Sequence, residues 1–237
     1  MQTVTGVGSS LWVKKGAGLF APTRRKFPIN GLAFYAPLWH PELNTSPFIS
    51  KDLNAHSCTA TGATWGIQGR TFDGVDDKII IADDAALNPA AFTLEAWVKP
   101  TNTAIADQED IIQKGATFSN QGYGLFINSS YGVRFTCGRT GGEETLNSSA
   151  TSAASNWIHC AGTFDGTTMT VYINGAASGT ATPASYESSA EDLNIGYNAR
   201  FANFAFEGII GEIMIYNRAL TTSEIVNTYL TTKWRYQ

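Results

Sequence analysis

WIHCAGTFDGTTMTVYINGAASGTA, residues 157–181, decides the fold of this chain. Asp165-Gly166 and Asn174-Gly175 separate three short runs that are apolar or alternate between apolar and polar residues. Such dipeptides are strong hairpin signals, because a two-residue primed turn needs positive φ at both central positions. The stretch therefore predicts three antiparallel strands without catalytic residues, and a second layer of strands must cover their apolar face.

The same period of two continues along the chain. Residues 92–99 alternate between an apolar side and a mixed side, and Pro100 ends the run. Residues 140–155 are polar and are expected to be mostly loop, with one edge strand near 145–147. Further strands are expected at 31–38, 61–65, 70–72, 78–82, 110–114, 123–128, 133–137, 192–196 and 209–216.

The last predicted element is a helix. Thr221 and Glu224 have the spacing of a capping box, which marks a helix start. The apolar side of this helix is expected to carry Ile225, Val226, Tyr229, Leu230 and Trp234. About a dozen short strands and one terminal helix predict an all-β sandwich of two antiparallel sheets.

Composition excludes several classes of protein. Only 15% of the 237 residues are charged, against about 25% in an average chain, which suits a sandwich with uncharged polar faces. The net charge of −4 is too small to indicate a nucleic-acid or membrane role. No apolar run is long enough for a membrane span, and the N-terminus lacks the pattern of a Sec signal peptide.

The three cysteines, Cys58, Cys137 and Cys160, have no CxxC spacing, so they do not indicate a zinc site. We expect them to be buried free thiols that pack as small apolar groups. The alternative is that Cys137 and Cys160 form a disulfide, which requires their strands to be adjacent.

Residues 1–30 differ in composition from the rest and are predicted to form an N-terminal arm outside a domain of residues 31–237. They are rich in Gly, Ser and Thr, and the first acidic residue is Glu42. One interpretation is a solvated tail. The interpretation favoured here is an arm that docks on an acidic partner surface. Its docking residues would be Trp12, Lys14, Lys15, Arg24, Arg25 and Lys26.

Five segments resemble the laminin-G-like domains of the concanavalin A-like lectin/glucanase superfamily. They are GRTFDGVDDKI at 69–79, FTLEAWVKP at 92–100, residues 157–166, VYING at 171–175 and residues 208–220. The resemblance covers residues 31–225 and implies a jelly roll of two stacked antiparallel sheets with six or seven strands each. It does not choose a function, because this fold carries lectins, adhesion modules, glucanases and capsid appendages.

Catalytic patterns are missing from the sequence. Glucanases of the superfamily resemble one another in a Glu-x-Asp-x-x-Glu strand motif that supplies two carboxylates, and no such spacing occurs here. His40, His56 and His159 are isolated, and no GxSxG elbow is present. These absences predict a non-catalytic protein, with a divergent glycoside hydrolase as a remote alternative.

A calcium ion is the cofactor that the sequence suggests. Asp73, Asp76 and Asp77 crowd one turn, and hard cations prefer several oxygen ligands from one loop. The resemblance adds Glu212, although Gly211 stands where the superfamily segment commonly has aspartate. The alternative is that the aspartates brace their own turn through backbone N–H groups.

An aromatic loop is the predicted ligand-binding site. Sugar binding needs exposed rings that stack on pyranose faces, beside amide or charged side chains that bind hydroxyls. The same aromatic residues could instead close the sandwich edge or form a protein contact. The candidate residues are Tyr197, Asn198, Arg200, Phe201, Asn203 and Phe204, with Tyr131 and Tyr186 as neighbours.

These patterns together predict a lectin-like module that recognises or coats a surface as a subunit of a larger assembly. A virion decoration or appendage protein, placed on the virion surface or outside a cell, is the favoured form of this hypothesis. The rival is a carbohydrate-binding module that acts as a monomer. The expected partners are other subunits and a glycan, not nucleic acid.

Overall fold

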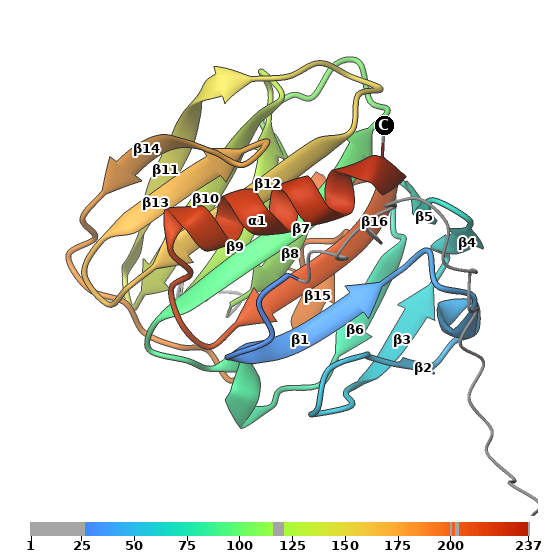
Figure 1. The fold of residues 1–237 in the computed structure, drawn as a ribbon, viewed down its shortest axis with the longest axis horizontal. Helices are drawn as coiled ribbons and strands as arrows, with labels where there is room; N and C mark the ends of the chain where they lie inside the picture. Colours follow the sequence, from blue (N-terminus) through green and yellow to red (C-terminus); the bar gives the residue numbers. More distant parts are fainter. Residues whose placement is uncertain (1–26, 116–120, 200, 202–203, 237) are drawn as a thin grey trace, which may run out of the picture.

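The computed structural model describes residues 27–115, 121–199, 201 and 204–236, which form two eight-stranded antiparallel sheets (Figure 1). Sheet A runs in the order β14 (Ala176–Ala181), β13 (Met169–Ile173), β12 (Ile158–Phe164), β7 (Phe92–Pro100), β16 (Glu207–Tyr216), β5 (Gly69–Asp73) and β4 (Thr64–Gly66), and β1 (Leu32–Pro37) also pairs with β16. Sheet B runs in the order β11 (Gly142–Thr151), β10 (Gly132–Arg139), β9 (Gly122–Asn128), β8 (Gln108–Lys114), β15 (Leu193–Ile195), β6 (Lys78–Ile81), β3 (Ser57–Thr61) and β2 (Phe48–Ile49).

The helices of the described residues are short. Helix α1 (Thr222–Thr232) lies across the outer face of sheet A, and three-residue 3-10 turns occur at η1 (Pro41–Leu43), η2 (Ala85–Leu87) and η4 (Lys233–Arg235). In the part of the chain that the structure describes, no helix is both long and apolar enough to cross a membrane. The predicted all-β sandwich with a short C-terminal helix is therefore confirmed, and each sheet has eight strands instead of the six or seven that the resemblance implies.

The two turns of the 157–181 stretch differ. Asn174 and Gly175 have φ of 51° and 78° and join Ile173 to its partner Ala176, which confirms the two-residue turn. The first turn is longer than predicted, because residues 165–168 lie between the paired Phe164 and Met169. The Asp165 carboxylate accepts hydrogen bonds from the backbone N–H groups of residues 167 and 168, and these bonds stabilise the wider loop.

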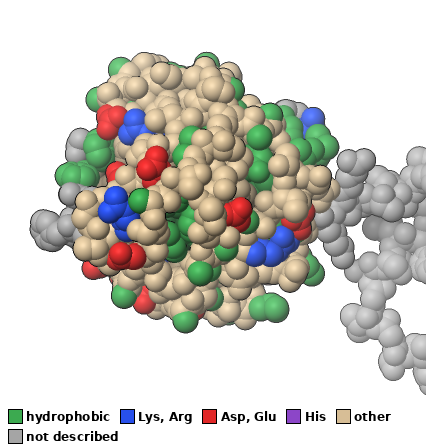
Figure 2. Space-filling view, turned by 90° about the vertical axis from the view of Figure 1, so that its left-hand side faces the viewer, with side chains coloured by type: hydrophobic (Ala, Val, Ile, Leu, Met, Phe, Trp, Pro, Cys, Tyr) green, Lys and Arg blue, Asp and Glu red, His purple; other side chains and the backbone are tan. Residues whose placement is uncertain are grey.

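The prediction of mostly loop at 140–155 was wrong. Strand β11 occupies ten of these residues and pairs with β10. It lies at the edge of sheet B, where one side of the strand has no partner strand, and most of its Ser, Thr and Glu side chains are exposed. Figure 2 shows the face of the molecule at this end, with isolated charges in an otherwise mostly uncharged surface. An exposed edge strand lacks the apolar alternation that identifies half-buried strands.

The core between the sheets is apolar and aromatic. The Phe92 ring lies within 6 Å of four other rings, those of Tyr123, Phe135, Phe164 and Tyr186. Phe135 of sheet B packs directly on Gly162 of sheet A, where a Cβ atom would lie 2.5 Å from the ring. The free thiols of Cys58, Cys137 and Cys160 are buried in the same core, as expected.

The outer face of sheet A is also buried, which the alternation of residues 92–99 did not predict. Trp97 and Glu95 point away from the main core, yet they are at most 1% exposed because α1 and η4 cover them. The rings of Tyr229 and Tyr236 stack on Trp97 with centroids 5.6 and 4.7 Å away. Trp97 Nε1 also donates to Thr232 Oγ1 at 2.7 Å.

Trp234 does not belong to the buried side of the helix, contrary to the prediction. Its side chain is 66% exposed, because α1 ends at Thr232 and the chain continues in the tighter η4 turn. Three residues per turn instead of 3.6 rotate the following side chains away from the helical stripe.

Residues 27–30, assigned to the arm, contact the sandwich. The Phe27 ring lies 5.1 Å from that of Tyr35, and the Pro28 carbonyl accepts a hydrogen bond from the Tyr216 hydroxyl. The predicted docking residues of the arm, Trp12, Lys14, Lys15, Arg24, Arg25 and Lys26, lie outside the described residues, so that role stays a prediction.

Candidate functional site

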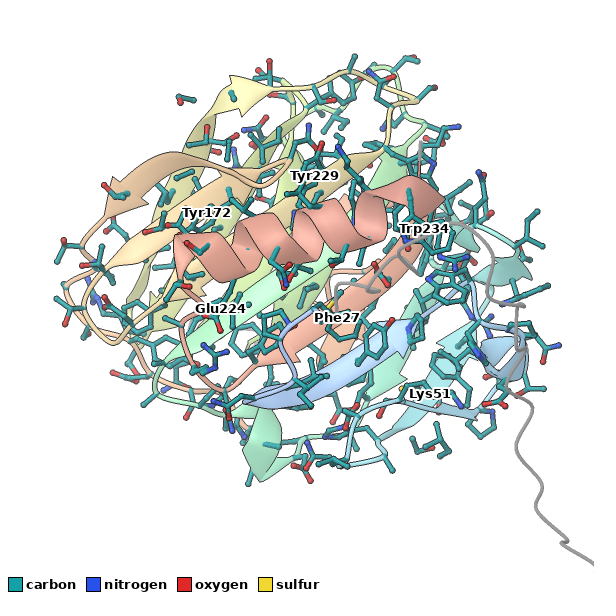
Figure 3. The ribbon with its side chains drawn as sticks, in the orientation of Figure 1. Phe27, Lys51, Tyr172, Glu224, Tyr229 and Trp234 are labelled. Atoms are coloured by element: carbon teal, nitrogen blue, oxygen red, sulfur yellow. The ribbon has the colours of Figure 1, made fainter. Side chains whose placement is uncertain are left out.

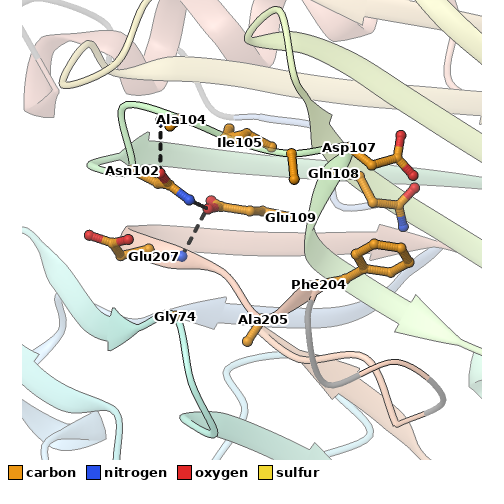
Figure 4. A pocket seen from close by; sticks show the side chains of 11 residues that line it. Gly74, Asn102, Ala104, Ile105, Asp107, Gln108, Glu109, Phe204, Ala205 and Glu207 are labelled. Atoms are coloured by element: carbon orange, nitrogen blue, oxygen red, sulfur yellow. Dashed lines mark hydrogen bonds between the residues drawn. The ribbon is translucent and has the colours of Figure 1, made fainter.

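A hollow of about 130 Å³ opens at the rim of the sandwich (Figure 4). Its lining residues are Gly74, Asn102, residues 104–109, Phe204, Ala205 and Glu207. Pairing of the start of β16 with both β5 and β7 brings these segments together: Glu207 lies opposite Asp73, and Gly208 lies opposite Pro100. The rim pocket is thus a product of sheet pairing between distant parts of the chain.

Glu109 forms the floor of the rim pocket and is 3% exposed. One carboxylate oxygen accepts a hydrogen bond from Asn102 Nδ2 at 2.7 Å, and the other accepts from the Glu207 backbone N–H at 3.3 Å. Burial raises the pKa of Glu109 above its ordinary value. Asn102 Oδ1 in turn accepts from the Ala104 N–H at 2.9 Å, so the wall is a fixed network (Figure 4).

Two polar side chains of the pocket lining are held by Arg134 of β10, which lies two strands away from β8 in sheet B. The Arg134 guanidinium donates to Gln108 Oε1 at 2.6 Å and to Asp107 Oδ1 at 3.1 Å. Among the described lining residues, Asp107, Glu109 and Glu207 carry carboxylates and none carries a positive charge. The pocket is therefore acidic and rich in hydrogen-bond acceptors.

Two phenylalanines stand at the aromatic edge of the pocket. Phe204 lines it, and Phe201, 42% exposed, lies edge-on to Phe204 with centroids 5.5 Å apart. Asn198 anchors this loop: its Oδ1 accepts from the Phe201 N–H at 2.8 Å, and its Nδ2 donates to buried Asp110 at 2.6 Å. Burial raises the pKa of Asp110 to about 8.

The other predicted ligand-binding residues occupy different environments. Tyr197 is half-buried, with Lys78 Nζ 4.7 Å from the centre of its ring. Tyr131 packs against the core and donates its hydroxyl to the carbonyl of the pocket residue Asn102 at 2.9 Å. Tyr186 packs on Phe92 at the edge of the core. Arg200 and Asn203 lie outside the described residues.

Sequence reasoning missed the polar wall of the pocket, namely Asn102, Asp107, Gln108, Glu109 and Glu207. A run of polar residues at the start of a strand that is otherwise buried was the available signal, because buried carboxylates need hydrogen-bond partners.

The predicted calcium residues do not all lie together. Ligand oxygens of Asp73, Asp76 and Asp77 lie within 4.8 Å of one another, a spacing that fits one cation. Asp73 accepts from the Val75 N–H at 2.9 Å and Asp77 accepts from the Asp73 N–H at 2.9 Å, as the bracing alternative requires. The N–H of Val75 lowers the pKa of Asp73, whereas burial raises that of Asp77.

Glu212 lies elsewhere. It is five positions beyond Glu207, the partner of Asp73, which corresponds to roughly 16 Å along the strand. Its carboxylate is buried beneath the C-terminal segment and accepts a hydrogen bond from the Tyr35 hydroxyl at 3.3 Å. Calcium binding by the three aspartates stays a prediction, and Glu212 is separated from them.

The family model of the concanavalin A-like lectin/glucanases superfamily matches residues 73–226. The chain belongs to this superfamily. The stretch that decides the fold, the acidic turn and all lining residues of the rim pocket lie inside the matched range. No curated protein matches the sequence.

Solved structures with the same fold include binding domains of bacterial toxins. The binding domain of botulinum neurotoxin DC, solved in complex with SialylT, has a TM-score of 0.65 and 14% identity over 86% of this chain. The binding domain of Paraclostridial mosquitocidal protein 1 has a TM-score of 0.66 and 16% identity over 84%. This superfamily member spans 52% of the length of each, and at such identity the likeness establishes the fold alone.

Proposed function

We propose that this chain is a non-catalytic saccharide-recognition module and that the rim pocket is its binding site. The observation that carries the proposal is the combination of Phe204 with carboxylate and amide side chains around one hollow. Aromatic rings stack on sugar faces, and such polar groups accept hydrogen bonds from sugar hydroxyls. The acidic lining favours neutral or amino sugars and repels sugars that carry carboxylates.

The arrangement of carboxylates supports binding rather than catalysis. Both oxygens of Glu109 already accept hydrogen bonds from the protein, and both oxygens of Asp110 are likewise engaged, by Gln108 and Asn198. Glu95 and Glu212 are sealed beneath the C-terminal helix. A general acid must instead reach the glycosidic oxygen of its substrate.

Similar structures support a recognition role. One is the binding domain of botulinum neurotoxin DC in complex with SialylT, and another is the same domain in complex with rat synaptotagmin II. This fold therefore occurs in domains that bind other molecules. The present chain covers about half of each of those domains, so the comparison supports the class of role and names no ligand.

The test is a glycan array followed by calorimetry with the neutral sugar that binds best. Phe204→Ala should weaken binding about tenfold, the loss of roughly 1.4 kcal/mol of stacking and burial. Leu53→Ala is the control, because Leu53 is fully exposed and lies away from the lining residues. Absence of any neutral ligand, or equal binding by Phe204→Ala and the unaltered chain, would contradict the proposal.

The same sugar tests the hydrolase alternative. We expect no release of reducing ends, and we expect Glu109→Gln to leave that background unchanged. Turnover that Glu109→Gln abolishes would establish catalysis in the rim pocket.

Placement of the module in a multi-subunit assembly, on a virion surface or outside a cell, stays a prediction from the sequence. Electron microscopy of the purified chain tests it, with ordered oligomers as the expected result. Particles of a single chain at all concentrations would favour the monomeric carbohydrate-binding module. A rise in melting temperature on addition of calcium, lost in Asp77→Asn, is the corresponding test of the metal prediction.

A further inference from the structure

A second cluster of aromatic and charged side chains lies at the C-terminal end of α1, with Trp234 exposed and Trp39, Lys233 and Arg235 partly buried. Figure 3 shows Trp234 at this end of the helix, and its side chain is 66% exposed. The Arg235 guanidinium carbon lies 3.4 Å from the centre of the Trp39 ring and 4.7 Å from that of Trp234. Lys233 Nζ lies 5.4 Å from the centre of the Tyr229 ring.

The position of this cluster is fixed by buried neighbours. Tyr236 is 3% exposed and packs on Gly211 of β16 so closely that a Cβ atom there would lie 2.4 Å from its ring. The N–H of Leu38 donates to the carbonyl of the same Gly211 at 2.9 Å, which places the following Trp39 beside the C-terminal segment. Arg235 is therefore held between two indole rings by residues on both sides of it.

Within the part of the chain that the structure describes, the N–H donors of these two cations have no acceptor. Among the described residues, no side chain or carbonyl accepts a hydrogen bond from the Arg235 guanidinium or from Lys233 Nζ, and neither forms an ion pair. By contrast, Arg70 donates to three backbone carbonyls, and Arg218 forms a two-fold bond with Glu224. A pre-positioned guanidinium whose N–H groups have no hydrogen-bond acceptor among the described residues matches the geometry of a carboxylate or sulfate.

The helix dipole explains only part of this arrangement. Positive side chains are favourable near a helix C-terminus, so the dipole accounts for the charge of Lys233 and Arg235. It does not require a large indole ring to lie exposed beside them, because exposing Trp234 forfeits the gain from burying it. Exposed Trp and Arg together are typical of binding hot spots.

We propose that Trp39, Trp234, Arg235 and Lys233 form a second binding site, for a saccharide that carries an oxyanion. The guanidinium would pair with the carboxylate or sulfate of the ligand, and the exposed indole would stack on its ring. The charge of this aromatic–cation site is opposite to that of the rim pocket, which is lined by three carboxylates. The two sites therefore select different sugars, and the second does not depend on the first.

Calorimetry of the full chain with polygalacturonate, dextran sulfate and uncharged dextran at low ionic strength tests this site. We expect one or both polyanions to bind, dextran not to bind, and added salt to weaken binding. Trp234→Ala and Arg235→Gln should each reduce affinity about tenfold or more. Arg139→Gln removes the same charge from β10 of the other sheet and should have little effect.

The following outcomes would contradict the proposal. No binding of either polyanion overturns it, and so does an equal loss with Arg235→Gln and Arg139→Gln, which indicates unspecific charge attraction. Polyglutamate tests the saccharide part: if it binds as tightly as the sugars and Trp234→Ala leaves that binding unchanged, the site takes an acidic peptide. Melting temperatures and Phe204→Ala serve as controls, because that variant alters the rim pocket alone.

Discussion

The two faces of sheet A are both buried, but by different chemistry. The inner face meets sheet B in a core of apolar side chains around Phe92 and Phe135. The outer face meets α1 and η4 through aromatic rings, and it also buries Glu95, His159 and Glu212. Neither oxygen of Glu95 and neither nitrogen of His159 has a hydrogen-bond partner among the described residues, although Glu95 Oε1 and His159 Nε2 lie 3.5 Å apart.

The two buried faces therefore differ in how they contribute to the stability of the fold. The inner core combines close packing with apolar atoms, which is the arrangement that gives most stability. The outer cluster buries groups whose charged forms are costly to desolvate. Burial raises the pKa of Glu95 well above its ordinary value, raises that of Glu212 to about 7 and lowers that of His159 to about 3. We therefore expect α1 to stay packed on the outer face of sheet A mainly while these three groups are neutral.

The largest expected effect is in the inner core. Phe135→Ala should lower the free energy of unfolding by about 3–5 kcal/mol, because the cavity faces Gly162 and nothing on β12 can fill it. Urea unfolding followed by fluorescence measures this change. A loss below about 1 kcal/mol would show that the two sheets do not depend on this contact.

The next effect is the pH dependence of the outer cluster. The pKa of Glu212 is about 7 in the folded chain against 4.5 as the ordinary value, so its stabilisation is complete below about pH 4.5 and is lost as pH rises through 7. The loss is roughly 1.4 kcal/mol per pH unit in that window. His159 acts in the opposite direction, since its lowered pKa costs stability as pH falls below 6.5.

The variant Glu212→Gln isolates the contribution of this glutamate to the pH dependence of stability. Between about pH 4.5 and pH 7 the melting temperature of the unaltered chain should fall relative to that of this variant, because the opposing effect of His159 is present in both proteins. Glu224→Gln is the matched control, because Arg218 lowers the pKa of Glu224 to about 2 and the carboxylate is therefore charged throughout this range. Identical profiles for Glu212→Gln and the unaltered chain would contradict the assignment.

The smallest expected effect tests whether Glu95 and His159 are both neutral or form an ion pair. Glu95→Met removes the unpartnered carboxyl and keeps its bulk, so we expect it to raise the free energy of unfolding by about 1–3 kcal/mol at pH 8. If Glu95 and His159 instead form a charged pair, the same change strands a buried cation and destabilises the chain by about 3–5 kcal/mol. Chemical denaturation decides between these signs.

The fold could be predicted from the sequence because local signals agree. Alternation in residues 92–99 and the Asn174-Gly175 turn each depend on near neighbours, and the capping box of Thr221 and Glu224 is present. The second buried face could not be predicted, because alternation shows only that Glu95 and Trp97 share a side, not that a helix from the other end of the chain covers it.

The candidate sites were harder to predict than the fold. Phe201 and Phe204 were found from their aromatic character, but the carboxylates of Asp107 and Glu109 come from β8 and its preceding loop, which meet the aromatic loop only after sheet pairing. Trp39 and Arg235 lie nearly at opposite ends of the chain, and Trp234 was expected to be buried. Contacts between distant segments are not encoded in any local pattern.

Backbone amide chemical shifts during a titration with a neutral oligosaccharide test the central claim, that the rim pocket is the recognition site, most directly. If the rim pocket binds the sugar, the largest shifts fall on residues 102–109 and 204–207, and the amides under α1 do not move. Largest shifts on another face, or no shifts with any neutral sugar that an array identifies, would contradict it.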